Sequence, residues 1–307
     1  MKIVVKILVV VLIVAGGSFL INAVQDPPTD ENFEVKLIND YNIYALPMPE
    51  SLDFAGESVP LDNPDIRERM DRELLVNTYW QSNGLLLFKR AHKYFPIIEP
   101  LLEKYGIPDD FKYLAIAESA LQNNRSPAGA AGFWHFMKGT GKEYGLEINN
   151  YVDERYNLEL ATKVAADYLK KSKKRFGSWT LAAAAYNGGN AGISKQQKRQ
   201  QEFDSYYDLL LNDETSRYVF RILAFKEILS NPKKYGFNFR DKDLYNHIPT
   251  YKVKVDTAVT DFTAFAKGFG INYKILKLHN PWLRDTFLKN ASGKEYFIEI
   301  PEEGYYK

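Results

Sequence analysis

The sequence predicts a mainly α-helical domain followed by a small module in the order strand, helix, helix, strand. Apolar residues recur at helical spacings of three and four from about Asp65 to Tyr235. After His247 the pattern changes, and two runs of alternating apolar and polar residues enclose two short helical segments. With 307 residues, 45% of them hydrophobic, the chain is long enough for two domains with buried cores. We therefore expect a helical domain at residues 67–240 and a βααβ module at residues 248–304.

The first 24 residues have the pattern of an export signal. Lys2 and Lys6 precede an apolar run that extends to Ile21. Cleavage is expected after Ala23, unless the run, which is close to the roughly 20 residues needed to span a bilayer, remains as a membrane anchor. Both interpretations export the rest of the chain, and the anchor would also hold it at the membrane. A buried N-terminal core helix fits the flanking lysines less well.

Residues 25–66 are predicted to form a linker with little regular structure. Acidic and small polar residues dominate this segment, and prolines interrupt it repeatedly. The prolines are Pro27, Pro28, Pro47, Pro49, Pro60 and Pro64.

Start and stop signals delimit the helices of the first domain. Pro108 is expected to open a helix with Asp109 and Asp110 in its first turn, because the positive end of the helix dipole favours acidic residues. Asn157 and Ser178 are expected to cap two later helices. Together with the apolar spacing, these signals predict helices at about 65–79, 85–94, 97–104, 108–121, 158–176, 179–186 and 214–229, and a glycine-rich loop at 123–142.

The module at 248–304 begins and ends with strand signals. In the first, Tyr251, Val253 and Val255 alternate with two lysines, and a second alternating run covers residues 296–300. Short helices are expected between them at about 261–268 and 273–278.

Composition and charge exclude several classes of function. Cysteine is absent, which excludes disulfides, thiolate zinc sites, iron–sulfur clusters and a cysteine nucleophile. The 40 basic and 39 acidic residues nearly balance, unlike the basic surplus of a general nucleic-acid binder. No strand is predicted before the glycine-rich loop, so it does not match a dinucleotide fingerprint. We expect no cofactor, no metal and no nucleic-acid partner, since the four histidines, His92, His135, His247 and His279, also lack metal-ligand spacing.

Glu118 is the strongest candidate for a catalytic residue. It lies on the same helix face as Leu114 and Leu121, among small apolar neighbours. Burial there is expected to raise the pKa of its carboxyl group and to keep a proton available near neutral pH, which suits a general acid acting on a glycosidic oxygen. The pattern alone leaves a second interpretation open, in which Glu118 points into solvent or pairs with Arg125.

Two later segments have the chemistry of a sugar-binding surface. Residues 126–137 combine a glycine loop, which lets backbone approach a ligand closely, with aromatic rings that can cover the apolar faces of sugars. Residues 185–189, Ala-Tyr-Asn-Gly-Gly, end a helix with polar side chains. Each segment alone also fits a structural role, as core aromatics in the first case and as a helix C-cap in the second.

In their order and spacing, these segments resemble the family 1 lytic transglycosylases. The resemblance covers about residues 80–235, and its carriers are Glu118-Ser119, residues 126–132, Met137, Asp153-Glu154-Arg155 and residues 185–188. It implies a lysozyme-like, mainly α fold and peptidoglycan glycan strands as the substrate. The bond cut would be the β-1,4 bond between N-acetylmuramic acid and N-acetylglucosamine. Together with the export signal, it implies a periplasmic or membrane-associated location facing the cell wall.

The resemblance also implies a role for each matching residue. Glu118 matches the single catalytic acid/base, which would protonate the leaving oxygen and then accept the proton of the muramyl 6-hydroxyl, closing a 1,6-anhydro ring. An oriented internal nucleophile has a large effective concentration, so it can replace the second carboxylate of other glycosidases. The residues implied to position the substrate are Ser119, Ser126, His135, Met137, Tyr186, Asn187 and Glu214.

His135 departs from the family, which usually has glutamine at this position. Both side chains exchange hydrogen bonds, but imidazole also titrates near neutral pH. The departure therefore bears on the positioning role, the pH profile or the substrate preference.

The C-terminal module resembles a LysM domain, which binds glycans that contain N-acetylglucosamine. The carriers are residues 251–255, 265–270, 276–282 and 296–301. The usual Gly-Asp-Thr-Leu after the first strand is replaced here by Val255-Asp256-Thr257-Ala258. Two expectations remain open, a glycan-binding module and a small structural appendage.

Three functions are consistent with the sequence. The leading one is a lytic transglycosylase that leaves anhydromuramyl ends. The second is a hydrolytic muramidase or chitinase that uses water. The third, which the departure at His135 keeps open, is a catalytically silent peptidoglycan-binding or scaffold protein.

Overall fold

The computed structural model describes residues 43–201, 204–291 and 293–306. The predicted signal or anchor at residues 1–24 lies outside the described residues, as does the part of the predicted linker at residues 25–42. Within the described part, no helix is long and apolar enough to cross a membrane. Contacts divide the chain after Ala45, and both the helical domain and the C-terminal module belong to the unit Leu46–Lys307.

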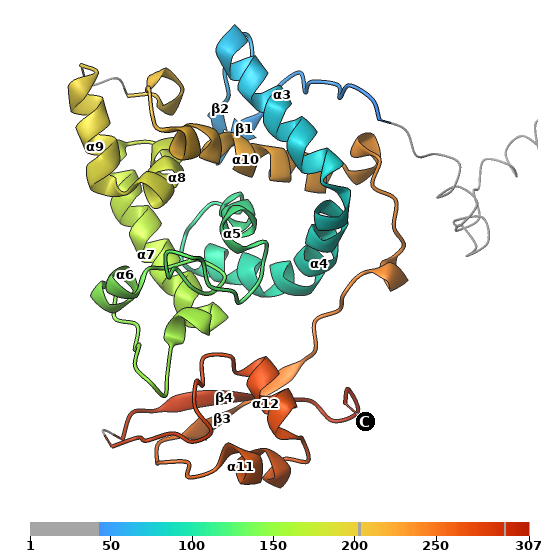
Figure 1. Cartoon of the computed structure of the whole chain (residues 1–307), viewed down its shortest axis with the longest axis vertical. Helices are drawn as coiled ribbons and strands as arrows, with labels where there is room; N and C mark the ends of the chain where they lie inside the picture. Colours follow the sequence, from blue (N-terminus) through green and yellow to red (C-terminus); the bar gives the residue numbers. More distant parts are fainter. Residues whose placement is uncertain (1–42, 202–203, 292, 307) are drawn as a thin grey trace, which may run out of the picture. The chain divides into compact units, whose positions relative to one another are not determined.

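The first domain is helical, as predicted, and its helices α3 to α10 pack around α5 (Figure 1). Both α4 and α10 contact α5, whose Phe111, Leu114 and Ala115 are fully buried. The helices are α3 (Pro64–Tyr79), α4 (Gln81–Lys104), α5 (Phe111–Ser119), α6 (Lys138–Glu143), α7 (Leu158–Phe176), α8 (Trp179–Gly188), α9 (Asn190–Arg199) and α10 (Asp213–Ser230), with short 3-10 helices at Glu154–Tyr156, Tyr206–Asp208, Pro232–Tyr235 and Asp241–Asp243.

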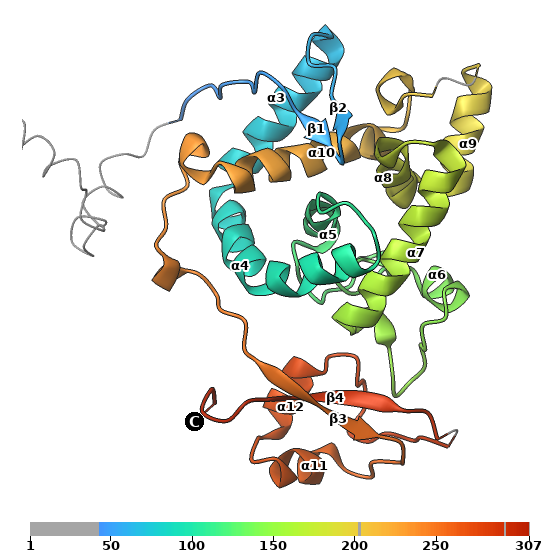
Figure 2. The same cartoon turned by 180° about the vertical axis from the view of Figure 1, so that it is seen from behind.

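Helix α4 is continuous where the sequence predicted two helices, at 85–94 and 97–104. Proline removes a backbone donor and normally ends or kinks a helix. Here Pro96 and Pro100 lie four positions apart on the exposed face, while Ile98 and Leu102 are fully buried on the other. The buried face holds the helix together, and the prolines bend it, as the curve of α4 in Figures 1 and 2 shows.

Helix α5 is shorter at both ends than the predicted range 108–121. Residues 108–110 form a turn before the helix, and the carboxylate of Asp110 binds Lys226 at 2.7 Å and the backbone N–H of Ala55 at 2.6 Å. At the other end, Ala120 and Leu121 adopt left-handed conformations with φ of 53° and 55°. Because such residues end a helix, Glu118 lies in the last turn of α5.

The two predicted helix caps are confirmed. The side chain of Asn157 accepts a hydrogen bond from Leu160 N at 3.1 Å, and that of Ser178 accepts one from Leu181 N at 3.2 Å. The short helices α6 and α9 were not predicted, because α6 contains two glycines and α9 buries a single apolar residue, Ile193.

The described end of the predicted linker contains regular structure. Strands β1 (Asp53–Phe54) and β2 (Glu57–Ser58) form a hairpin, and Phe54 is fully buried in the core. The carboxylate of Glu57 accepts hydrogen bonds from Trp179 N and Thr180 N at the start of α8. Burial alone would raise the pKa of Glu57, but these bonds and those from side chains outweigh it and lower the pKa to about 2. The hairpin is thus an N-terminal cap of α8.

The βααβ module is confirmed. Strands β3 (Thr250–Val255) and β4 (Tyr296–Pro301) pair antiparallel, with α11 (Phe262–Gly268) and α12 (Tyr273–His279) between them in sequence. Its core contains the fully buried apolar residues Phe262, Ala266, Leu276 and Ile298.

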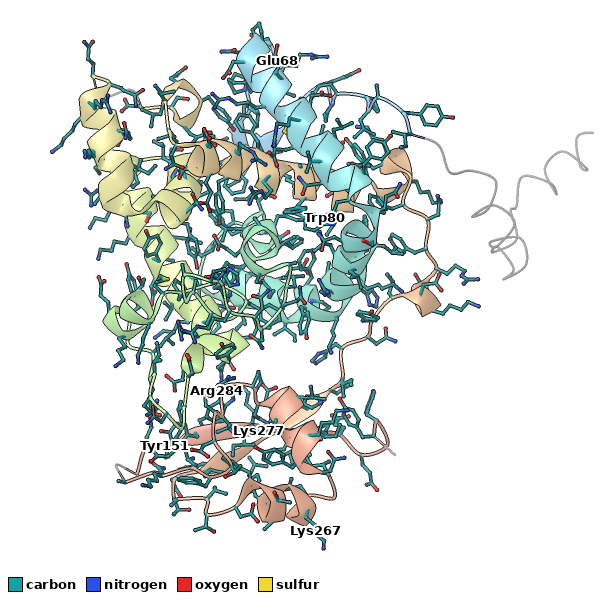
Figure 3. All side chains as sticks on the ribbon, in the orientation of Figure 1. Glu68, Trp80, Tyr151, Lys267, Lys277 and Arg284 are labelled. Atoms are coloured by element: carbon teal, nitrogen blue, oxygen red, sulfur yellow. The ribbon has the colours of Figure 1, made fainter. Side chains whose placement is uncertain are left out.

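The module contacts the segment of the helical domain that joins α6 to α7. Arg284 donates its backbone N–H to Tyr151 O at 2.8 Å, and its guanidinium lies 4.4 Å from the centre of the Tyr156 ring. Lys294 binds Glu154 at 2.7 Å. Figure 3 labels Tyr151 and Arg284 at this contact. The module therefore supports the segment that contains Arg155, whose other contacts belong to the site below.

Candidate active site

Glu118 lies against helix α10 at the end of α5. Its carboxylate accepts a hydrogen bond from the hydroxyl of Tyr218, which is itself 2% exposed. The side chain of Glu118 is 15% exposed, and Leu114 and Leu121 beside it are fully buried. Glu118 is thus partly buried, as its spacing predicted, and its contacts are with Tyr218 and His135 rather than with Arg125.

Burial makes the carboxyl group of Glu118 a weaker acid than a carboxyl group in water. Loss of hydration is the largest effect and raises its pKa from 4.5 to about 7, against the opposing hydrogen bond from Tyr218. The negative charge of Glu214 raises the pKa further, and the positive charge of Arg221 lowers it. A carboxyl group with a pKa near 7 holds a proton in about half of the molecules at neutral pH, so it can both donate and accept one.

His135 is the second group in contact with Glu118. Its Nδ1 lies 3.7 Å from Glu118 Oε2, and its Nε2 lies 2.6 Å from Asn124 Oδ1. Because the amide oxygen is an acceptor, the neutral ring carries its proton on Nε2. Burial lowers the pKa of His135, so the ring is neutral at pH 7 and leaves the proton of Glu118 in place.

The loop that carries His135 is fixed by Arg155. The guanidinium donates to Gly129 O and Phe136 O, both at 3.0 Å, and is held by Asp153 at 2.9 and 2.7 Å. A Cβ on Gly132, which has φ of 80°, would lie 1.9 Å from the backbone oxygen of Arg155. Glycine is therefore required at this position, and the loop is rigidly placed beside the end of α5.

Tyr186, Asn187 and Glu214 lie together between α8 and α10. The hydroxyl of Tyr186 donates to Trp134 O at 2.8 Å, which joins α8 to the loop. Asn187 donates to Glu214 at 3.0 Å and accepts from Thr215 at 2.7 Å. Burial raises the pKa of Tyr186 well above 10, and the charge of Glu118 adds to this effect. The structure thus brings these three predicted residues close to Glu118.

The other predicted residues lie in different surroundings. Met137 is 47% exposed at the start of α6, where it can contact a ligand. The hydroxyl of Ser126 accepts from Ala130 N at 3.0 Å and so closes the glycine loop. Ser119 is 3% exposed and donates to Ala115 O in its own helix. Its hydroxyl is not brought together with the exposed groups of the site.

Sequence reasoning did not assign a role to Tyr218 or Asn124. Tyr218 follows Glu214 by four residues, so the helical spacing placed it on the same face and offered a signal. Asn124 had none, because its contact with His135 depends on the path of a loop. Within the described residues, no three His, Cys, Asp or Glu side chains are grouped as a metal site would need.

Comparison with known families defines the two parts of the chain. Residues 96–209 match the transglycosylase SLT domain, and residues 251–304 match the soluble lytic transglycosylase C-terminal LysM-like domain. Two regions of the chain therefore match these domain families, in the order that the sequence motifs predicted.

Individual proteins show the same similarity. The chain is 30% identical, over 258 residues, to the membrane-bound lytic murein transglycosylase D of Escherichia coli K12 and to its counterpart in Escherichia coli O6:H1. These alignments cover 81% of this chain and 55% of each relative, so the chain spans about half of their length. A solved structure of an inactive mutant of the lytic transglycosylase Slt from Pseudomonas aeruginosa aligns with 50% of this chain and 26% of that one, at 20% identity and a TM-score of 0.36, a likeness too weak to bear on the fold.

Proposed function

We propose that this protein is a peptidoglycan lytic transglycosylase that cleaves the β-1,4 bond between N-acetylmuramic acid and N-acetylglucosamine. The observation that carries the proposal is the largely desolvated carboxyl group of Glu118, with a pKa of about 7, in a region that matches the transglycosylase SLT domain. The similarity to lytic murein transglycosylase D supports the same substrate class.

In the first step Glu118 acts as a general acid. Its proton passes to the glycosidic oxygen, and the bond between that oxygen and C1 of the muramyl residue breaks. The carboxylate that forms keeps the hydrogen bond from Tyr218, which stabilises the new charge in a site where water is scarce.

In the second step Glu118 acts as a general base. The 6-hydroxyl of the muramyl residue attacks C1, and its proton passes to the carboxylate, which restores the acid. The attacking group is part of the substrate, so the reaction needs no second carboxylate in contact with the reacting carbon. Glu214 is the nearby acid that acts on Glu118 through its charge, and its own carboxylate is held by Asn187.

Mass spectrometry of the products from purified sacculi tests this reaction. A lytic transglycosylase releases fragments with 1,6-anhydromuramyl ends, each lighter by one water than the fragment that a hydrolase releases. Reducing muramyl ends as the main product would contradict the proposal and favour the hydrolytic muramidase.

The role of Glu118 is tested by Glu118→Gln, which keeps the shape of the side chain and removes its acid. We expect the release of fragments to fall by at least about a hundredfold, the contribution of a general acid. Glu143→Gln, which changes a 66% exposed side chain on the same domain, is the matched control. If the wild-type chain releases nothing but sediments with sacculi, the catalytically silent binding protein is the better interpretation.

We also propose that the LysM-like module binds glycan and that the chain is exported to face the cell wall. The family match of residues 251–304 and the lysine-flanked apolar run at residues 1–24 support these two proposals. Fractionation of cells that express a C-terminally tagged chain tests the location, and the mobility of the tagged chain separates a cleaved signal from an anchor.

A further inference from the structure

A buried carboxylate between α3 and α10 gathers three arginines. Glu73 on α3 is 1% exposed, and its carboxylate binds Arg72 at 2.5 Å, Arg217 at 2.8 Å and Arg221 at 3.9 Å. One buried carboxylate is neutralised by one cation, so this cluster carries two positive charges in excess. We call these four residues the arginine cluster.

Contacts within the protein occupy only some of the hydrogen-bond donors of these arginines. Their side chains are 49%, 34% and 28% exposed for Arg72, Arg217 and Arg221. Arg217 and Arg221 contact Glu73 through Nε, and within the described residues their terminal nitrogens have no hydrogen-bond acceptor. A guanidinium has five N–H donors in a plane that matches a carboxylate, so each arginine can bind one more anionic group.

The cluster lies next to the catalytic acid. Glu214, Arg217 and Arg221 lie at spacings of three and four on α10 and so share one side of the helix, and Tyr218 lies on that side too, four residues after Glu214 and three before Arg221. Tyr218 binds Glu118 directly, and Arg221 is close enough for its charge to act on both of them.

The surface beside the cluster is apolar and exposed. Val76 and Trp80 follow Arg72 at intervals of four along α3 and are 43% and 61% exposed. Figure 3 shows Trp80 at the junction of α3 and α4. A ligand that covers this surface would meet an aromatic face, an aliphatic side chain and the guanidinium groups within one helix length.

We propose that Arg72, Arg217 and Arg221 bind a carboxylate of the peptide that is attached to the muramyl residue. This inference rests on the proposed function, because it identifies which peptidoglycan strands the site prefers. The sugars of the glycan carry no free carboxylate once the muramyl lactyl group is joined to its peptide, whereas that peptide carries carboxylates. The arginine cluster therefore makes the enzyme prefer strands that still bear peptides.

The experiment compares two substrates with the full chain. One is uncrosslinked glycan strands with their peptides, and the other is the same strands after carbodiimide coupling has turned the peptide carboxylates into neutral amides. We expect wild-type kcat/KM to be about tenfold to a hundredfold higher on the strands with free peptide carboxylates, the size of a charge-assisted interaction. Arg72→Gln and Arg221→Gln should each reduce this ratio severalfold, and both leave Arg217 to pair with Glu73.

The ratio separates substrate preference from effects on Glu118, since a change in the acid affects both substrates. Arg67→Gln, an exposed arginine on α3 outside the cluster, is the control and should keep the wild-type ratio. A ratio near one in the wild type, or an unchanged ratio in both variants, would overturn the inference.

Binding provides a readout that does not depend on catalysis. A peptide-bearing disaccharide should bind the wild-type chain about tenfold more tightly than the Arg72→Gln chain, and Arg67→Gln should bind it as the wild type does. Wild-type binding of this kind without any cleavage would refute the proposed function and support the subsite, whereas cleavage with equal binding by the three chains would refute the subsite alone.

Discussion

Two glutamates of the same domain, both in contact with helix α10, have opposite partners. Glu118 contacts a tyrosine hydroxyl and a neutral histidine, while Glu73 contacts three guanidinium groups. The partners on α10 are neighbours in the sequence, since Arg217 binds Glu73 and Tyr218 binds Glu118. One helix therefore supplies cations to one carboxylate and a neutral hydroxyl to the other.

The comparison teaches that burial alone does not make a glutamate catalytic. A carboxylate that is paired with cations joins the helices that supply them, whereas one that is desolvated without a cation in contact holds a proton more readily. The first arrangement supports the fold, and the second makes the folded chain less stable in exchange for an acid that works at neutral pH.

The largest expected contrast is a gain in stability when Glu118 is changed to glutamine. The pKa of Glu118 is raised in the folded chain from 4.5 to about 7, so the folded state binds its proton more tightly than the unfolded state does. Stability is therefore lost as the pH rises from 4.5 to 7, and by linkage the loss reaches ~3 kcal/mol above pH 7. Glu118→Gln removes this loss.

Thermal unfolding at two pH values measures the effect. At pH 8 the Glu118→Gln chain should unfold at a higher temperature than the wild type, and at pH 4.5 the two should be equal. Glu143→Gln, at an exposed position, should match the wild type at both. An increase in stability that is the same at both pH values would show that the charge of Glu118 is not the cause.

Glu73→Gln should destabilise the folded chain, which is the opposite of the effect expected for Glu118→Gln. The substitution leaves three guanidinium groups, two of them from α10, around a neutral amide. It should reduce the free energy of unfolding by about 2–3 kcal/mol. The loss is smaller than for a fully buried pair because the arginines are partly exposed. Chemical denaturation measures the loss, with Glu99→Gln, a 41% exposed partner of Lys112, as the control. Equal effects at positions 73 and 99 would contradict the comparison.

Local signals in the sequence predicted much of the fold. The caps at Asn157 and Ser178 and the strand pairs of the module depend on residues within a few positions of each other. The continuous helix α4 was not predicted, because only its packing shows that Pro96 and Pro100 share an exposed face. The hairpin at 53–58 was missed for a similar reason, since Glu57 caps a helix that starts more than 120 residues later.

The sequence predicted the part of the candidate site that lies on helix α5. The spacing of Leu114, Glu118 and Leu121 indicated a partly desolvated acid, and the side chain of Glu118 is 15% exposed. What distinguishes Glu118 from Glu73 comes from α10, about 100 residues beyond Glu118 and 144 beyond Glu73. No periodicity in the sequence records which of two adjacent residues on α10 faces which carboxylate.

Tyr218→Phe sharpens the contrast by removing a partner of Glu118. The hydrogen bond from Tyr218 lowers the pKa of Glu118, so its loss should raise the pKa above about 7. The fall of activity on the alkaline side should then occur at higher pH, and turnover at the optimum should fall about tenfold because the carboxylate that forms has lost a donor. Tyr113→Phe, another buried tyrosine of the domain, should change neither. If the fall of activity on the alkaline side moved to lower pH instead, the assigned role of Tyr218 would be contradicted.

His135→Gln should have the smallest effect of these substitutions on activity at pH 7. Burial lowers the pKa of His135, so the ring is neutral at pH 7 and its replacement by a neutral amide changes no charge beside Glu118. Activity at pH 7 should stay within about threefold of the wild type, and the alkaline limb set by Glu118 should not move. The acid side should differ, since a protonated imidazole 3.7 Å from the carboxyl favours its ionised form and glutamine cannot be protonated.

A pH profile of kcat/KM from 4.5 to 8.5 separates these outcomes, with His92→Gln as the control because His92 contacts Tyr245 O away from Glu118. An alkaline limb that moves with His135 would mean that the histidine, and not burial, sets the protonation of the acid. An acid limb that flattens while the alkaline limb stays would assign the two limbs to His135 and Glu118 separately, since only the histidine loses its charge as the pH rises through its lowered pKa.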